Sequence, residues 1–169
     1  MKKGLCLIMG FVTLIFAGFA YSLTIPIYLL NHNGHGKCIG SVKAEDTIYG
    51  VLLTPALHDL PPGMHGFQVH QNPLCVNYGM AAGGHFDPEK TDEHKGPYNG
   101  SGHLGDLPAL FVDDDGRAKM PMVAPRLKLA DIAGRSLIIH EGEDNYADFP
   151  ERQGGEGGRI ACGVIGYPH

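Results

Sequence analysis

The sequence lacks an excess of positive charge. Its 13 lysine and arginine residues are outnumbered by 18 aspartate and glutamate residues, which gives a formal net charge of −5. Nucleic acids and anionic membrane surfaces attract proteins that carry a surplus of positive charge. The acidic balance therefore argues against both as partners.

After residue 22 the chain also lacks a long apolar pattern with the 3.6-residue period of an amphipathic helix. Short runs of strand-forming residues recur instead, and turn signals such as DLPPG and DDDG separate them. The runs are LTIPIYLL, KCIGSVKA, TIYGVLLTPAL, GFQVH, ALFVDDDGRAKMPMVAP, SLIIHEG and RIACGVIGY. We find no internal repeat and no low-complexity linker. The pattern predicts one all-β domain, either a sandwich or a barrel.

The N-terminal apolar run is short for a membrane-spanning helix, which needs about 20 residues. It extends over 16 residues, Leu5 to Ala20, follows two lysines and ends among small residues. A basic start, an apolar centre and small residues at the end are typical of a secretory signal peptide. We expect residues 1–22 to be a cleaved signal peptide and residues 23–169 to be one exported domain without a membrane anchor. Loss of the two lysines takes the formal charge from −5 to −7.

Cysteine is scarce, and one of the four cysteines lies in the expected signal peptide. The other three are Cys38, Cys75 and Cys162. In an oxidising compartment two of them should form a disulfide and one should remain as a thiol. The count alone does not select the pair.

Histidine, in contrast, is abundant, with ten residues in a chain of 169. Half of them lie in or directly beside two long polar segments, residues 71–106 and 141–158, which are rich in Gly, His, Asp and Pro. Structureless loops of this length are uncommon in compact domains and are usually functional. A bound metal and a disulfide are the natural means of ordering them.

One histidine group lies within the first polar segment. His85, His94 and His103 are spaced nine residues apart, and Asp106 follows three residues later. Three imidazoles and one carboxylate suit a closed tetrahedral Zn²⁺ site. These ligands converge only if the loop folds round the ion, and the bound ion then supplies the ordering energy. Solvated surface histidines are the alternative, but this concentration of residues favours the metal.

A second group is spread along the chain. His70 ends the GFQVH run, His140 ends the SLIIH run, and His85 can belong to both groups. Imidazole-rich sites suit copper, and a doubly deprotonated imidazole can bridge two cations through its two nitrogens. A lone strand histidine such as His140 is more often a core residue, but the HEGEDN segment favours a ligand. Its Asp144 can accept hydrogen bonds from the N–H groups of ligand histidines.

The motifs AGGHFDP, HKGPYNGSGHLGDLPAL, MVAPRLKL, SLIIHEGEDNYADFP and GGEGGRIACGVIG resemble the bacterial exported copper/zinc superoxide dismutases. The similarity extends over nearly the whole chain after the signal peptide. It implies an eight-stranded Greek-key β-barrel, an immunoglobulin-like sandwich with two long functional loops. It also implies a periplasmic enzyme, monomeric or homodimeric, that holds one Zn²⁺ and one redox-active copper ion. Such an enzyme converts the superoxide anion to oxygen and hydrogen peroxide.

The resemblance also implies the ligands of both metals. The implied zinc ligands are His85, His94, His103 and Asp106, and the implied copper ligands are His70, His85 and His140, with His85 as the bridge.

Further roles follow from the same resemblance. Arg159 in GGRIAC matches the arginine that guides the anion to copper, so Arg159 and His85 are the implied catalytic residues. Cys75 and Cys162 match the disulfide of the family, which leaves Cys38 as the unpaired thiol.

The chain departs from the family at Gln68. The family reads HGFHVH where this chain reads HGFQVH, so a glutamine stands at the position of a copper ligand. An amide oxygen is a harder and weaker donor for copper than an imidazole nitrogen. We therefore expect weakened Cu(II) binding and an impaired dismutase.

Two other functions stay open at the level of sequence. One is a zinc-stabilised, copper-poor relative that binds or buffers metal ions. The other is a disulfide-bonded β-sandwich that serves as an interaction module, in which the histidines are incidental. Arg159 and Asp144 favour the dismutase, because a zinc scaffold would not need both.

Overall fold

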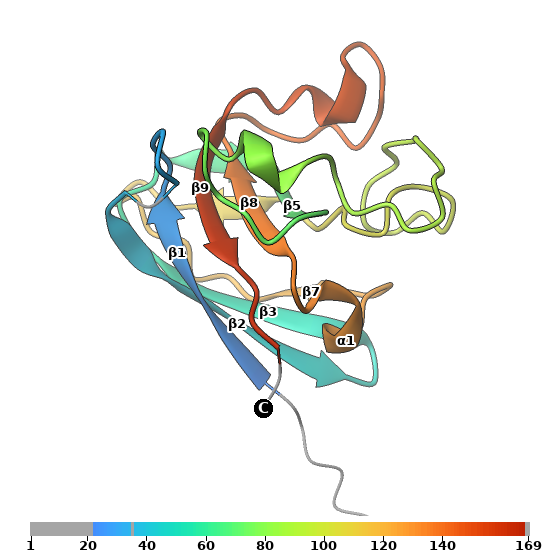
Figure 1. Ribbon diagram of the computed structural model, residues 1–169, viewed down its shortest axis with the longest axis horizontal. Coiled ribbons are helices and arrows are strands. Elements are labelled where there is room, and N and C mark those ends of the chain that lie inside the picture. Colours follow the sequence, from blue (N-terminus) through green and yellow to red (C-terminus); the bar gives the residue numbers. More distant parts are fainter. Residues whose placement is uncertain (1–21, 35, 168–169) are drawn as a thin grey trace, which may run out of the picture.

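The structure is a computed structural model that describes residues 22–34 and 36–167 (Figure 1). Residues 1–21 of the expected signal peptide lie outside the described residues, whereas its last residue, Ser22, is described. Within these residues, no helix has the length and the apolar character that crossing a membrane requires.

Nearly all regular structure in the described residues is β-strand. The strands are β1 (Ser22–Leu29), β2 (Cys38–Thr47), β3 (Gly50–Leu57), β4 (Gly63–His65), β5 (Phe67–His70), β6 (Leu110–Val112), β7 (Met122–Ala124), β8 (Ser136–His140) and β9 (Arg159–Val164). The helical elements are the short helix α1 (Leu129–Ile132) and the 3₁₀ turns η1 (Met80–Ala82) and η2 (Arg152–Gly155).

The strands form a curled antiparallel sheet in the order β5-β8-β9-β1-β2-β3-β7, and β4 pairs with β6. Only Gly66 separates β4 from β5, so this stretch joins the two sheets by pairing with β6 and then with β8. Counted as one strand, it gives the eight strands that we expected. After β6 the chain crosses over to place β7 beside β3. The architecture is the predicted Greek-key β-barrel.

The TIYGVLLTPAL run, which we expected as one strand, is divided by a hairpin turn. β2 ends at Thr47, β3 begins at Gly50, and these two residues are paired. The Thr47 hydroxyl donates to the Gly50 carbonyl at 2.7 Å and accepts the Tyr49 N–H at 3.1 Å. Ile48 and Tyr49 form the exposed tip. Two apolar residues at the tip concealed the turn, because turns are usually recognised by polar residues, Gly and Pro.

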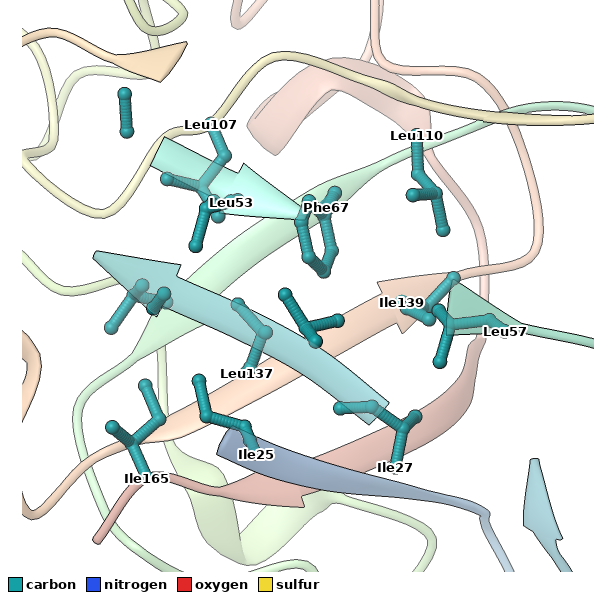
Figure 2. Packing of buried hydrophobic residues seen from close by; sticks show 14 of the residues in the cluster. Ile25, Ile27, Leu53, Leu57, Phe67, Leu107, Leu110, Leu137, Ile139 and Ile165 are labelled. Carbon is teal, nitrogen blue, oxygen red and sulfur yellow. The ribbon is translucent and has the colours of Figure 1, made fainter. Parts of the chain in front are cut away.

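Alternation along the strands places one set of apolar side chains inside the barrel (Figure 2). Fully buried members of this core are Ile25, Ile27, Leu53, Leu57, Phe67, Leu107, Leu110, Leu137 and Ile139. Burial of each large aliphatic or aromatic side chain contributes about 1.5–3 kcal/mol. The core therefore gives firm support to β5 and β8, which contribute Phe67, Leu137 and Ile139 to it.

β5 and β8 are buried on both faces. Phe67 and Val69 of β5 belong to the core cluster, so Gln68 and His70 point to the opposite face. The loops 71–106 and 141–158 lie beside β5, β8 and β9 on the same side of the barrel (Figure 1). The outward-facing polar side chains of β5 therefore lie in an enclosed space between the barrel and its loops.

Candidate metal centre

The first loop is attached to the edge of β5 at two points. Val69 accepts one backbone hydrogen bond from the loop at 2.8 Å and donates another at 2.9 Å. Isolated bridges place His85 beside His70 and Asp106 beside Gln68. His85 and Asp106, which are 21 positions apart in the loop, are thus fixed beside two positions on the same face of β5.

A disulfide attaches the start of the same loop to β9. Cys75 and Cys162 are bonded, with Cα atoms 5.9 Å apart, and both are buried. The pairing that the resemblance implied is confirmed. Cys38 is an exposed thiol.

The first histidine group converges as the loop spacing predicts. The donor atoms of His85, His94, His103 and Asp106 all lie within 4.8 Å of one another, and all four residues are buried. Asp106 lies at the centre, with its carboxylate 3.0, 3.1 and 3.4 Å from the three Nδ1 atoms.

This group passes a test of fit for a cation. Among the described residues, the buried Nδ1 atoms of His94 and His103 have no hydrogen-bond partner, although each lies within 3.4 Å of Asp106. Buried polar nitrogens are normally hydrogen-bonded. Nitrogens that converge on one point without such bonds suit a shared ion, and the donor set is the one that Zn²⁺ takes.

The protonation of this group opposes metal binding. Burial would raise the pKa of Asp106, but the three histidine rings that face its carboxylate hold it far below its usual range. Burial would lower the pKa of His94, but the adjacent carboxylates of Asp106 and Asp144 raise it to about 10. A metal ion that binds here must therefore displace a proton from His94.

The second group consists of His70, His85 and His140, whose donor atoms also lie within 4.8 Å of one another. The Nε2 atoms of His70 and His140 are 3.5 Å apart. The Nδ1 atom of His85 faces Asp106, whereas its Nε2 atom faces the second group. One ring therefore presents one nitrogen to each group, which is the arrangement that a bridging imidazole requires.

His70 and His140 are held as neutral rings. Burial, reinforced by nearby His85, lowers the pKa of His70 well below its usual value and that of His140 to about 3. The Nδ1–H of His70 donates to the Gly83 carbonyl at 3.0 Å, and that of His140 donates to the Gly157 carbonyl at 3.4 Å. These bonds leave Nε2 as the donor atom for a metal, because a neutral imidazole binds metal through its unprotonated nitrogen.

Gln68 is fixed between two carboxylates. Its side-chain amide donates to Asp144 Oδ2 at 3.1 Å and to Glu156 Oε2 at 2.5 Å. Carboxylates accept hydrogen bonds, so the Nε2 atom must be the one that faces them. The Oε1 atom is buried and has no hydrogen-bond partner among the described residues. Gln68 thus lies in the second group without an imidazole nitrogen to offer.

Glu156 is a site residue that the sequence did not reveal. Its side chain is only 3% exposed, and Oε1 lies 3.1 Å from His85 Nε2 and 3.2 Å from His140 Nε2. Burial raises the pKa of Glu156, and hydrogen bonds from His85 and Gln68 oppose that increase. The available signal was one acidic residue inside the glycine-rich GGEGG stretch.

Asp144 lies between the two groups. Its Oδ1 atom accepts hydrogen bonds from His94 Nε2 at 2.8 Å and from the Tyr146 N–H at 2.7 Å. Its contact with the second group is through Gln68 rather than a histidine. A Cβ atom at Gly154, where φ is +80°, would lie 2.1 Å from Asp144 Oδ1. Glycine is therefore required there for the loop to approach the carboxylate.

Arg159 lies at a surface pocket of about 280 Å³ whose lining also includes His140 and Glu156. Its guanidinium donates to the carbonyls of Gly79 and Gly83 at 2.6 and 2.7 Å. An anion that enters this pocket meets a fixed positive charge beside the second histidine group.

Comparisons with known proteins agree with this geometry. The sequence profile of the family described as copper/zinc superoxide dismutase (SODC) matches residues 38–165. The chain is 49% identical to the superoxide dismutase [Cu-Zn] of Legionella pneumophila over 166 residues, which cover 97% of this chain and 98% of that protein.

Solved structures give the same result. A Cu/Zn superoxide dismutase from Brucella abortus aligns with a TM-score of 0.81 at 45% identity, covering 85% of this chain and 99% of that one. The monomeric copper, zinc superoxide dismutase from Salmonella enterica aligns with a TM-score of 0.76 at 45% identity and the same coverage. The chain belongs to the copper/zinc superoxide dismutase family.

Proposed function

We propose that this protein is an exported superoxide dismutase that converts superoxide to oxygen and hydrogen peroxide. Family membership supports the reaction. The observation that carries the proposal is the position of His85, whose two ring nitrogens face two separate buried ligand groups. The signal-peptide pattern of residues 1–22 supports export to the periplasm.

The donor sets suit the two metals of the family. The first group would hold Zn²⁺ through His85, His94, His103 and Asp106, and the second would hold copper through His70, His85 and His140. Bound copper supplies the one-electron couple for oxidising one superoxide to oxygen and reducing another, with two protons, to hydrogen peroxide.

Arg159 attracts and orients the anion. Without the signal peptide the protein carries a formal net charge of −7, so long-range attraction of superoxide depends on local positive charge at the pocket. Because two backbone carbonyls fix the guanidinium, Arg159 needs little reorganisation when an anion arrives.

His85 is suited to handling a proton at Nε2. Asp106 holds the Nδ1 side of the ring, so the ring keeps its place while Nε2 gains or loses a proton. The Nε2 atom faces His140 and Glu156, which line the pocket that Arg159 shares. A proton held there is available to a reduced oxygen species in the pocket.

Gln68 should weaken copper binding and slow the reaction. A site with one imidazole fewer is a poorer match for copper. In addition, Asp144 and Glu156 engage the amide nitrogen of Gln68.

The presence of Gln68 at the position of a copper ligand favours a second candidate function, a zinc-stabilised and copper-poor protein that binds or buffers metal ions. Its first histidine group would be filled and would order the loops, while the second would take copper only in part.

Metal content and dismutase rate distinguish the two functions. The mature domain is loaded with zinc and copper, dialysed against a chelator, and compared with Gln68→His. We expect the substitution to improve copper retention by about tenfold or more, as for a change of a metal-binding residue, and to raise the rate several-fold. Gln71→His adds a histidine at an exposed neighbouring position and should change neither.

Two results would count against these expectations. If the wild-type protein retains stoichiometric copper and gains nothing from histidine at position 68, the account of Gln68 is wrong. If the copper-loaded protein has no dismutase activity, the enzymatic proposal is wrong and the metal-binding function stands in its place.

A further inference from the structure

We propose that Glu156 is a ligand of the metal in the second histidine group, which makes this a site of three imidazoles and one carboxylate. The inference deepens the proposed function and rests on its assignment of a metal to His70, His85 and His140. It does not depend on whether the bound metal dismutates superoxide.

The distances fit a shared ion. Glu156 Oε1 lies 3.1 Å from His85 Nε2 and 3.2 Å from His140 Nε2, and the latter is 3.5 Å from His70 Nε2. Two donors that are each about 2.1 Å from one ion, at the tetrahedral angle, lie about 3.4 Å apart. The carboxylate oxygen therefore lies at the spacing of metal ligands from two of the three ring nitrogens, those of His85 and His140.

The carboxylate is held as metal-binding carboxylates usually are. One oxygen faces the histidines, and the other accepts the hydrogen bond from Gln68 at 2.5 Å. Such outer hydrogen bonds orient a ligand and are part of most metal sites. Gln68 is on this account a positioning residue for Glu156.

The main chain is built to accommodate this side chain. The Glu156 carbonyl accepts the Gly142 N–H at 2.7 Å, and the Gly142 carbonyl accepts the Gly66 N–H at 2.7 Å. A Cβ atom at Gly66 would lie 1.9 Å from Glu156 Oε2. The glutamate thus occupies a space that Gly66 leaves open at the junction of β4 and β5.

The residues at positions 68 and 156 act as a matched pair. A glutamine amide has two N–H donors, and these serve the carboxylates of Asp144 and Glu156. A metal-bound histidine has one N–H left and cannot serve both. With this pair, the fourth donor to the metal comes from Glu156, in the segment that precedes β9, and not from position 68 on β5.

The negative charge of the Glu156 carboxylate also favours its coordination to a metal ion. A carboxylate that is 3% exposed is stabilised in its ionised form by a nearby cation, and a metal ion held by the three histidines would supply one. A carboxylate beside Arg159 would also repel an incoming anion unless a metal compensates its charge. Coordination satisfies both requirements. Since a carboxylate is a harder donor than imidazole, this site should favour divalent ions over Cu(I) more than a four-imidazole site does.

The test measures Cu(II) binding to protein already loaded with zinc. Glu156→Gln should lower the Cu(II) affinity by about tenfold or more, as expected for loss of a residue at a metal, with zinc content unchanged. Glu151→Gln is the matched control, because Glu151 lines the same pocket but is exposed. It should leave the Cu(II) affinity unchanged.

Electron paramagnetic resonance of the Cu(II) protein supplies a readout that needs no variant. The wild-type spectrum should show coupling to three coordinating nitrogens. The Gln68→His, Glu156→Gln double variant should show four. If the Glu156→Gln protein does not fold, four coordinating nitrogens in the wild-type spectrum would still overturn the inference.

Three results would overturn the inference: four coordinating nitrogens in the wild type, unchanged Cu(II) affinity and spectrum in Glu156→Gln, or no Cu(II) uptake beyond the zinc group. The second result would also be obtained if Gln68 Oε1 were the fourth donor. Three nitrogens together with a weakened Glu156→Gln variant, but no dismutase activity, would support the inference and reject the proposed enzymatic function.

Discussion

Replacing Cys75 and Cys162 with alanine should lower the free energy of unfolding by about 4–5 kcal/mol. The disulfide joins residues that are 87 positions apart. In the chain-entropy model, closing a loop of this length lowers the entropy of the unfolded state by about 15 cal/mol/K, which is about 4.6 kcal/mol at 25 °C.

Packing and position add to that effect. The two cysteines form a small buried cluster with Ala82 and Ile138, so the loss of both sulfur atoms also removes buried contacts. The segment after Cys75 contains Gly79 and Gly83, whose carbonyls hold Arg159. We therefore expect the dismutase rate of the variant to fall as well, because the guanidinium loses its fixed position.

The assay is urea unfolding of the metal-free proteins, with and without the two substitutions. Both proteins should carry Cys38→Ala, because the exposed Cys38 thiol could exchange with the disulfide. Beforehand, alkylation of the unreduced wild-type protein should label Cys38 alone. A loss of stability below about 1 kcal/mol would refute the entropic argument, and labelling of Cys75 would refute the pairing.

Three further predictions concern other parts of the molecule. Arg159→Ala should reduce the second-order dismutase rate by about tenfold or more and weaken its dependence on ionic strength; an unchanged salt dependence would argue against its role in attracting the anion. Removal of both metals should increase proteolysis within residues 71–106 and 141–158 while β1–β3 resist cleavage, because ligation orders the loops; equal cleavage rates with and without metal would contradict this. Phe67→Ala should lower the free energy of unfolding, measured in urea, by about 3–5 kcal/mol because it empties a fully buried position; a loss near zero would show that the core collapses round the gap.

Features with a local signal were predictable from the sequence. The alternation of GFQVH is sufficient to assign Phe67 and Val69 to one face of a strand and Gln68 and His70 to the other. The zinc group was visible because its members lie within 22 residues of a single loop. The disulfide pairing required the family resemblance, since spacing did not select it.

Features that depend on long-range contact or on hidden turn chemistry were not predictable. Glu156 is 71 positions from His85 and 88 from Gln68, and both of its important contacts form only when the barrel brings the two loops together. The turn at Ile48 and Tyr49 was missed because Thr47 makes the stabilising hydrogen bonds while the tip itself is apolar.

Because β5 is buried on both faces, a shift in its pairing with β8 would affect the core and the metal site together. A shift of one residue in its pairing with β8 would turn Phe67 outward and His70 inward. This register shift would place an imidazole in the hydrophobic core and would also remove His70 from the second histidine group. Metal binding therefore stabilises only the correct register of β5 and β8, because a chain with shifted pairing lacks the ligand group that holds the ions.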